Sequence, residues 1–498
     1  MKQRSIRRRL AVVSIAGAAV VLGSTGVALA SNDTPHSSES HGAPNSAVAS
    51  QYPSSWSMYA GNSLHNPAYT APAHAQGLMR GYYWNTPEVN AIPLSSSQAY
   101  DQSILGLRGA PVKTTQMLGN SCGVTVVGGI VYAEESSGWL YAIQASTGKV
   151  IWKAQGNNAM MGNPIVANGV VVTTTGDTGF SFSQVQKYAA HKPAIRGMGY
   201  AAVYGYNAKT GALLWRQPAV GEEMASPAYA NGLVYEGTGG GHVLAMDIKT
   251  GKIVWRTTVG GFDSMSSVAV SGNQVFAGFS NPNYLYALNA QTGAVNWKAT
   301  VAGVANTGMG DNSPSVDPKA NLVVQDSVVN ANPTTGTMNL EVWAVYATGA
   351  NAGQIAWTQK LGVGPKPPAY KAGVTMIHNG TVYVGSPITS SFYALNEATG
   401  AIKWSFPISG AGPAGAGRGS ATYYHGIVWL AAGPKIYAIN PANGALLDSK
   451  VGGGRYGIVN PVIVGGTMFL DNSWGWVQAL PLSSIYSNWA NFGTTTKS

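Results

Sequence analysis

Residues 321–329 read NLVVQDSVV, and the aspartate inside this apolar, strand-like run is the first candidate for chemistry. The chain contains few carboxylates, with 19 Asp and Glu residues among 498. Asp326 could move a proton at a binding site, or it could cap the turn into the residues that follow. A general base must be ionised at the working pH, and aspartate, with a reference pKa of about 3.9, is the carboxylate best suited to acid.

Other polar side chains stand at the starts of apolar strands. Arg418 lies in GAGRGS and Arg455 in GGGRYG, where a guanidinium between small residues could bind an anion through two parallel hydrogen bonds. Turn capping is the alternative for the uncharged and acidic residues of this group, because Asn and Asp favour turns. We predict that both arginines bind substrate, together with Asn163, Asp263 and Asp311.

The elements that position these residues repeat along the chain. In each unit a Thr-Gly turn is followed, four residues after the glycine, by a tryptophan. The complete copies end at Trp152, Trp215, Trp255, Trp297 and Trp404, and the degenerate copies join Gly353 to Trp357 and Gly444 to Asp448. An apolar strand precedes each copy, as IVYAE, VVVTT, LVYEG, QVFAG, LVVQD, TVYVG, IVWLA and TMFLD. These strands recur at spacings of roughly 40 to 63 residues, as repeat arrays require.

Each unit reads as four short strands, and four-stranded units of about 40 residues form β-propellers. The sequence therefore predicts an all-β fold, an eight-bladed β-propeller of four-stranded antiparallel blades, over residues 53–498. The recurring tryptophans should dock neighbouring blades. The last unit lacks a Thr-Gly-Trp strand, so we expect the segment around Trp56 to supply its outer strand and close the ring. Loop insertions are expected near residues 176–198 and 327–339.

Aligning the eight apolar strands places Asp326 at a defined position, the last residue of the second strand of its blade. Most blades carry a small residue there, so the blade itself does not require a carboxylate. The second strand ends at the face that carries the loops between blades, where a rigid scaffold presents binding residues. The equivalents are Glu134, Thr174, Gly237, Gly278, Gly385, Ala431 and Asp471.

Composition and the N-terminus indicate an exported protein. Lys2, Arg4 and residues 7–9 precede an apolar run that ends in Ala-Leu-Ala at residue 30, the layout of a cleavable signal peptide over residues 1–30. Residues 31–52 read as a flexible leader. Only 10% of residues are charged, against a typical value of about 25%, which suits an acidic exterior where carboxylate salt bridges are lost. A neutral, charge-poor secreted protein is the alternative.

The repeat units resemble those of the pyrroloquinoline quinone (PQQ) propeller superfamily, for example AMDIKTGKIVW at residues 245–255. This superfamily includes quinone-dependent dehydrogenases, outer-membrane assembly lipoproteins and a hydrolase of sulfur compounds. The larger dehydrogenases carry an adjacent cysteine pair and a calcium site, whereas Cys122 is the single cysteine of this chain. The assembly lipoproteins carry a lipid-anchor cysteine after the signal, and none follows the apolar run here.

In length, export signal, charge-poor composition and the QDS strand end, the sequence is similar to the tetrathionate hydrolases of acid-living sulfur oxidisers. The resemblance implies hydrolysis of tetrathionate to thiosulfate, sulfate and sulfur at acidic pH, with Asp326 handling the proton of the attacking water. It also implies no cofactor, no metal site and a homodimer. The alternatives are a PQQ-dependent dehydrogenase and a non-enzymatic scaffold of the assembly type.

We expect a small anionic sulfur compound as partner. The basic residues of the signal leave with it, and the remaining charge is too small for a nucleic-acid footprint. No later stretch is long enough to span a membrane. The expected location is periplasmic, secreted or associated with the outer membrane.

Overall fold

The computed structural model describes residues 57–69, 113–116, 123–135, 138–176, 184, 186–187, 190, 192, 194–197, 201–305, 312–365, 373–409, 418–456, 458–471 and 476–493. The chain divides into two units, Met1–Gly42 and Ala43–Ser498, and every described residue belongs to the second. The predicted signal peptide and leader therefore lie outside the described residues. Within the described part of the chain, no helix has the length and apolar character needed to cross a membrane.

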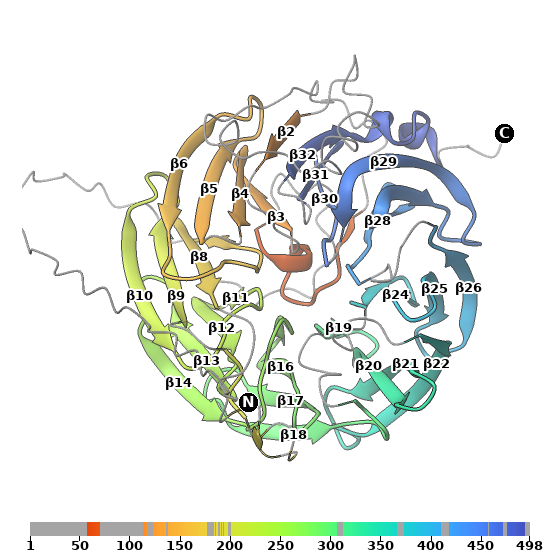
Figure 1. Ribbon diagram of the computed structural model, residues 1–498, viewed down its shortest axis with the longest axis horizontal. Coiled ribbons are helices and arrows are strands. Elements are labelled where there is room, and N and C mark those ends of the chain that lie inside the picture. The colour runs from red at the N-terminus through yellow and green to blue at the C-terminus, as the bar shows by residue number, and fades with distance from the viewer. Residues whose placement is uncertain are drawn as a thin grey trace, which may run out of the picture. The chain divides into compact units, whose positions relative to one another are not determined.

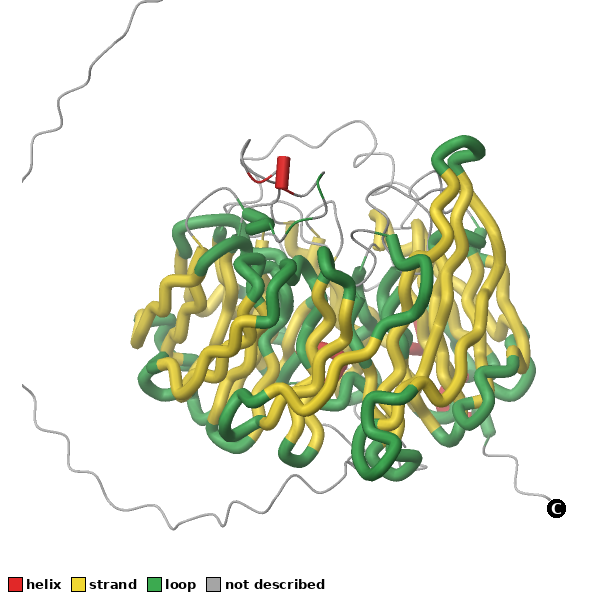
Figure 2. The backbone as a smooth tube through the Cα atoms, turned by 90° about the horizontal axis from the view of Figure 1, so that it is seen from below, coloured by secondary structure: helices red, strands yellow, loops and turns green. Residues whose placement is uncertain are grey.

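The second unit is a ring of eight four-stranded sheets, as the sequence predicts (Figure 1). Strand pairs within each blade are antiparallel, and one short parallel pair is added at the inner edge of a single blade. Figure 2 shows the blades from the side, with loops at both faces of the ring. We number the blades one to eight along the chain.

Each of the first four blades is built from four consecutive strands, and the innermost strand comes first in the chain. They are β3 (Val124–Val127), β4 (Ile130–Glu135), β5 (Trp139–Gln144) and β6 (Val150–Gln155); β7 (Ile165–Ala167), β8 (Val170–Thr175), β9 (Ala201–Asn207) and β10 (Leu213–Ala219); β11 (Ala228–Ala230), β12 (Leu233–Gly237), β13 (His242–Asp247) and β14 (Ile253–Thr258); and β15 (Ala269–Ser271), β16 (Gln274–Phe279), β17 (Tyr284–Asn289) and β18 (Val295–Ala299).

Blades five to eight complete the ring, and the last two each take a strand from the N-terminal part of the chain. They are β19 (Ser315–Asp317), β20 (Leu322–Asn332), β21 (Thr337–Tyr346) and β22 (Ile355–Pro365); β23 (Met376–His378), β24 (Thr381–Ser386), β25 (Ser391–Asn396) and β26 (Ile402–Pro407); β27 (Thr422–Tyr424), β28 (Ile427–Ile439) and β29 (Leu446–Tyr456) with β1 (Ala68–Tyr69); and β30 (Val462–Val464), β31 (Thr467–Asp471) and β32 (Trp476–Pro481) with β2 (Lys113–Gln116). Three short 3₁₀ helices are η1 (Tyr59–Gly61), η4 (Leu482–Ser484) and η5 (Trp489–Asn491).

The repeat tryptophans dock neighbouring blades, as predicted. The indole N–H of Trp255 in blade three donates to the Ala290 carbonyl of blade four at 2.9 Å, and its ring covers Gly293 of the next Thr-Gly turn. A Cβ at Gly293 would lie 2.5 Å from the ring, and its φ of 71° also favours glycine. Equivalent indole bonds are made by Trp152, Trp215, Trp297, Trp357 and Trp404.

Ring closure differs from the prediction. The outer strand of blade eight is β2, which pairs antiparallel with β32, and Trp56 lies outside the described residues. Residues 57–69 instead run along the innermost strands in the centre of the ring (Figure 1). Their carbonyls accept backbone hydrogen bonds from Val166, Val270, Val316 and Tyr423, which belong to four different blades. This central segment therefore satisfies the free inner edges of several sheets at once.

The expected loop insertion at residues 327–339 is also wrong, because β20 and β21 continue through it as a long hairpin. Val328, Leu340 and Met338 are buried and extend the alternation of the strands. The turn lies at residues 333–336, where the Asn332 side chain accepts from the backbone N–H groups of Thr334 and Thr335 at 2.9 and 3.2 Å. The other expected insertion, near residues 176–198, is described only in part.

Candidate active site

Asp326 lies in β20 of blade five and is fully buried. In blades two to eight the position equivalent to Asp326 lies two residues after the second-strand residue that pairs with the first residue of the innermost strand, as Asp326 follows Val324, the partner of Ser315. In blade one Glu134 lies one residue after Ala133, because β3 begins one residue earlier than the other innermost strands. The alignment made from sequence is therefore correct, although Asp326 stands within its strand and not at the end. The innermost strands begin at one face of the ring, and the second strands of the other blades end there. We call it the Asp326 face.

Hydrogen bonds around Asp326 involve its backbone and its neighbours in the chain. The side-chain amide of Asn312 donates to the Asp326 carbonyl at 3.0 Å, and Gln325 donates to the Asn312 carbonyl at 2.8 Å. Among the described residues, neither carboxyl oxygen of Asp326 completes a hydrogen bond or ion pair. The backbone N–H groups of Gly373 and of Asp326 itself favour the charged form of the carboxyl group, but their effect is smaller than that of burial.

Burial is the dominant influence, and it raises the pKa of Asp326 well above its usual value. An aspartate of ordinary pKa would be ionised above about pH 4. No described cation pairs with Asp326, and desolvation outweighs the backbone hydrogen bonds, so burial favours the protonated form instead. At acidic pH the group is a neutral carboxylic acid, which can donate a proton.

A second group of buried acidic side chains lies elsewhere on the Asp326 face. It spans blades one, three, four and eight, and each member is at most 1% exposed. We call this group the acidic cluster; its members are Glu134, Glu222, Glu223, Glu236, Asp263 and Asp471.

Burial and mutual repulsion raise the pKa values of Glu134, Glu223 and Glu236 in the acidic cluster. Glu223 and Glu236 have pKa values well above their usual range, first because of burial and then because of the charges of Asp263 and of other cluster members. Burial raises the pKa of Glu134 to about 8 despite hydrogen bonds from the Thr173 hydroxyl and the Gly162 N–H. These carboxyl groups are therefore neutral in acid and become mutually repulsive as the pH rises.

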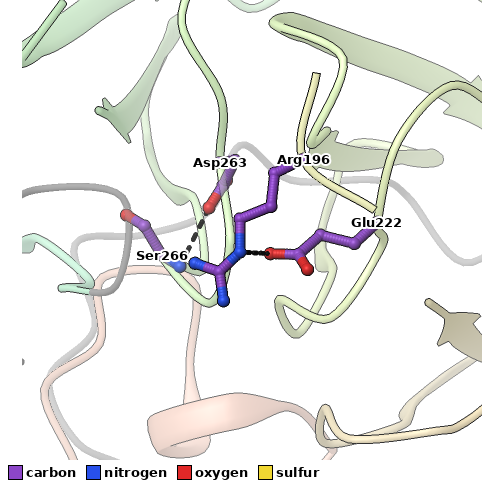
Figure 3. Close-up of polar contacts among 4 residues, drawn as sticks. All are labelled: Arg196, Glu222, Asp263 and Ser266. Carbon is purple, nitrogen blue, oxygen red and sulfur yellow. Dashed lines mark hydrogen bonds and ion pairs between the residues drawn. The ribbon is translucent and has the colours of Figure 1, made fainter. Parts of the chain in front are cut away.

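One described cation, Arg196, contacts the acidic cluster. Its Nε lies 2.9 Å from Oε1 of Glu222, an ion pair by distance although the N–H does not point straight at the oxygen (Figure 3). Its guanidinium carbon is 5.8 Å from the centroid of the Phe262 ring. The residue belongs to the partly described segment between β8 and β9.

A chain of polar contacts joins the acidic cluster to Asp326. The Ser266 N–H donates to Oδ1 of Asp263 at 3.0 Å (Figure 3), and the Ser266 hydroxyl donates to the Asn312 carbonyl at 2.8 Å. Asn312 in turn donates to the Asp326 carbonyl. Blades four and five are thereby fixed relative to each other at this face.

Similar contacts tie together the beginnings of other innermost strands. The backbone N–H of Asn163 donates to the Ser226 hydroxyl at 2.7 Å, that of Ser226 to Ser267 at 3.0 Å, and that of Ser267 to Ser313 at 3.0 Å. Each serine therefore links its own blade to the preceding one. The resulting scaffold is rigid, as a catalytic site requires.

The central segment packs against the beginnings of several blades at this face. Tyr59 and Ala60 of η1 pack with Met224, Met265 and Val374 at the beginnings of three blades. Tyr59 is 4% exposed. Because Val374 follows Gly373, whose N–H faces Asp326, the segment supports the backbone next to the candidate catalytic residue.

The structure brings together some of the predicted substrate ligands. Asn163 and Asp263 are buried at the Asp326 face, and Arg418 is partly buried just before β27. Arg455 does not begin an innermost strand as expected; it lies in β29, seven positions before β30, because the outer strand of blade seven is unusually long. Asp311 lies outside the described residues.

Sequence reasoning missed Glu236 and gave no role to Arg196. Glu236 stands in LVYEG, directly before Gly237, the equivalent of Asp326 in blade three. A glutamate inside an apolar strand could have identified it as a candidate site residue. Arg196 had no such signal, because its partner Glu222 is separated from it by a whole strand pair.

The described residues include no group of three or more His, Cys, Asp or Glu with a geometry that could hold a metal ion. The sequence has a single cysteine, so the adjacent-cysteine disulfide of the quinone-dependent dehydrogenases cannot form. The chain therefore lacks the cysteine pair of the larger quinone-dependent dehydrogenases.

Comparison with known proteins agrees with this geometry. Residues 101–192, 194–343 and 341–469 match the family described as outer membrane protein assembly factor BamB. Tetrathionate hydrolase from Acidithiobacillus ferrooxidans is 39% identical over 476 residues, covering 94% of both chains. Tetrathionate hydrolase from Acidianus ambivalens is 39% identical over 464 residues, covering 87% of this chain and 85% of its own.

Solved structures share the fold at low sequence identity. BamB from Moraxella catarrhalis is 15% identical with a TM-score of 0.54, covering 74% of this chain and 97% of its own. A europium-containing methanol dehydrogenase is 12% identical with a TM-score of 0.51, covering 84% of this chain and 89% of its own. These likenesses support the propeller architecture, while the two relatives of near-full length show that the chain belongs to the tetrathionate hydrolase family.

Proposed function

We propose that this protein hydrolyses tetrathionate to thiosulfate, sulfate and sulfur at acidic pH, with Asp326 as the proton donor. The single observation that carries the mechanism is the burial of Asp326 without a charged partner among the described residues, which keeps the carboxyl group protonated in acid. The substrate is proposed from the family, whose members named above are tetrathionate hydrolases.

In the first step, water attacks a divalent sulfur and the neighbouring sulfur–sulfur bond breaks. The electron pair leaves with the thiosulfate half, whose terminal sulfur takes the proton of Asp326. The attacking water loses a proton, which restores the Asp326 acid. The other half, a sulfonate bearing an S–OH group, then gives sulfate, a sulfur atom and a proton. Together, tetrathionate and water yield thiosulfate, sulfate, sulfur and two protons, so atoms and charges balance.

Two roles are open to Asp326, base toward the attacking water or acid toward the leaving group, and we propose the second. A base would have to be ionised before the reaction, and burial opposes that. A neutral acid needs no charged partner, and it offsets the negative charge that develops on the leaving thiosulfate. The proton of the attacking water still reaches Asp326, but after the donor step.

The PQQ-dependent dehydrogenase and the assembly scaffold remain the alternatives. The larger dehydrogenases carry an adjacent cysteine pair, which a chain with the single Cys122 cannot form. The scaffold shares the propeller, yet at 15% identity that likeness concerns the fold alone. Export to the periplasm, the cell exterior or the outer membrane and assembly as a homodimer are further proposals, which rest on the signal-like N-terminus and on the family resemblance.

The test is to offer tetrathionate to the purified protein at about pH 3, below the reference pKa of aspartate, without quinone or calcium. We expect thiosulfate to appear in proportion to the tetrathionate consumed. Activity that arises only after quinone and calcium are added would restore the dehydrogenase. No turnover of tetrathionate under either condition would favour the scaffold.

A further inference from the structure

We propose that Arg196 binds one sulfonate group of the substrate, and that the surrounding carboxyl groups permit this only in acid. The identity of the anion rests on the proposed function. The binding of an oxyanion by Arg196 does not, because it follows from how this side chain is held.

The backbone of Arg196 is clamped between two segments of blade three. Its N–H donates to the Gly239 carbonyl at 2.9 Å, and its carbonyl accepts from the Glu222 N–H at 2.7 Å. A Cβ at Gly239 would lie 2.4 Å from the Arg196 carbonyl oxygen, so this close approach requires glycine. Arg196 therefore has a fixed position although it belongs to an insertion.

The side chain is oriented by Glu222 and Phe262. The ion pair to Glu222 uses Nε, and the ring of Phe262 lies beside the guanidinium. The side chain is 13% exposed. No described residue accepts a hydrogen bond from either terminal nitrogen. In Figure 3 the guanidinium extends from Glu222 toward the turn that contains Asp263 and Ser266.

A guanidinium held through Nε presents its two terminal amino groups as a planar fork. Such a fork matches two oxygens of a sulfonate, and its weak hydration lowers the cost of partial burial. The ring of Phe262, whose centroid lies 5.8 Å from the guanidinium carbon, adds to the preorganisation without competing for the donors.

Buried carboxyl groups stand on the segments packed around Arg196. Glu222, Glu223 and Asp263 come from the segments that begin blades three and four, and Glu236 comes from β12. Glu134 and Asp471, in blades one and eight, complete the acidic cluster. When Glu134, Glu223, Glu236 and Asp471 are protonated, little negative charge besides the paired Glu222 opposes an anion at the free end of the Arg196 guanidinium; when they ionise, they repel the anion.

The position of Arg196 relative to Asp326 suits a substrate with a charge at each end. Arg196 rests on blades three and four, Asp326 lies in blade five, and Arg418 precedes the innermost strand of blade seven. The two arginines therefore flank Asp326 around the ring. The contact chain through Asp263, Ser266 and Asn312 ties the Arg196 side of this arrangement to Asp326.

Thiosulfate is a suitable probe, because its sulfonate group is that of the substrate and it undergoes no turnover. Binding of thiosulfate at about pH 3 should be measured calorimetrically for the wild type and for Arg196→Gln, and we expect the Kd to rise at least about tenfold on loss of the charged fork. The matched control is Arg256→Gln, which removes an exposed arginine from the outer strand of blade three and should leave the Kd unchanged. Equal affinities for Arg196→Gln and the control would overturn the proposal.

Arg196→Lys provides a second measurement if Arg196→Gln does not fold. Lysine keeps the charge but loses the fork, so we expect a Kd several-fold above that of the wild type. An unchanged Kd in a folded Arg196→Lys protein contradicts a bidentate site.

The pH arm uses Glu223→Gln. Wild-type affinity should fall as the pH rises from about 4 toward 8, whereas Glu223→Gln should keep its affinity to higher pH because one repelling charge cannot form. Affinity that is independent of pH in the wild type would show that the acidic cluster does not control anion binding.

Failure of the proposed function is distinguishable from failure of this inference. If tetrathionate is not hydrolysed but thiosulfate binding depends on Arg196, the anion site stands and the reaction is wrong. If tetrathionate is hydrolysed and Arg196→Gln changes neither the KM nor the Kd, the reaction stands and Arg196 is structural.

Discussion

The Asp326 face buries carboxyl groups in two regions that differ in their surroundings. Asp326 stands apart, and burial is what raises its pKa. In the acidic cluster, burial acts together with repulsion between several carboxyl groups, and Arg196 lies against one of them. An isolated neutral acid can lose its proton and regain it with little effect on its neighbours. Ionisation in the cluster instead changes the electrostatics of the whole group.

The largest effect on activity is expected at Asp326. In Asp326→Asn the side chain keeps its shape and hydrogen-bonding capacity but cannot donate an acidic proton. We expect kcat to fall by at least about 10²-fold, the lower range for general acid–base catalysis. The melting temperature should change little, since five of the seven equivalent positions in other blades carry small residues without a carboxyl group. An active variant that melts far below the wild type would make Asp326 a structural residue.

A smaller effect is expected at Arg418, on the other side of Asp326. Arg418→Ala should raise the KM by roughly tenfold, from loss of one charge-assisted hydrogen bond of about 1.5 kcal/mol. The kcat should change less than in Asp326→Asn. Arg455→Ala tests the same idea for the arginine in β29, and initial-rate kinetics on both variants measure the effect. An unaltered KM in both would leave the arginines without a role in binding.

The smallest expected effect is on the free energy of unfolding, and it tests whether the acidic cluster is protonated in the folded state. Burial and repulsion raise the folded-state pKa of Glu236 above its usual value. Below the unfolded-state pKa both states are protonated. As the pH rises from about 4.5, the unfolded chain releases its proton first, so the free energy of unfolding declines until the folded-state pKa is reached. The wild type should therefore be most stable in acid.

Glu236→Gln removes one of these ionisations while keeping the side chain's size. Its denaturant midpoint should decline less steeply than that of the wild type between about pH 4.5 and 8. The outward-facing Asp448→Asn in β29 is the matched control and should follow the wild-type curve. A wild-type midpoint that increases over this interval would contradict the assignment of raised pKa values.

The regular parts of this fold could be predicted from the sequence because each blade repeats its own local signals. The Thr-Gly turns and tryptophans identified the blades, and the register of the second strands identified Asp326 as an exception. The closing strand β2 could not be recognised, because KTTQ carries no repeat signature. The central segment was also missed, since its partners are single backbone groups on separate blades.

The chemistry of the site was less predictable than its location. Sequence alone indicated that Asp326 was unusual, but the direction of its pKa shift depends on burial and on the absence of a pairing cation among the described residues. Likewise, Glu236 and Asp263 are distant in sequence and meet only through the packing of blades three and four. Spatial neighbours of this kind decide whether a carboxyl group works as an acid or as a base.

The pH dependence of kcat distinguishes a proton donor from a base at Asp326. At saturating tetrathionate, and over the pH range in which circular dichroism shows a folded protein, kcat should be constant in acid and fall as the pH rises through the raised pKa of Asp326. The same limb should appear in Glu236→Gln, because that residue belongs to the acidic cluster. A kcat that instead increases between about pH 3 and 5, as an ordinary aspartate with a pKa near 3.9 ionises, would show that Asp326 acts as a base and contradict the proton-donor mechanism.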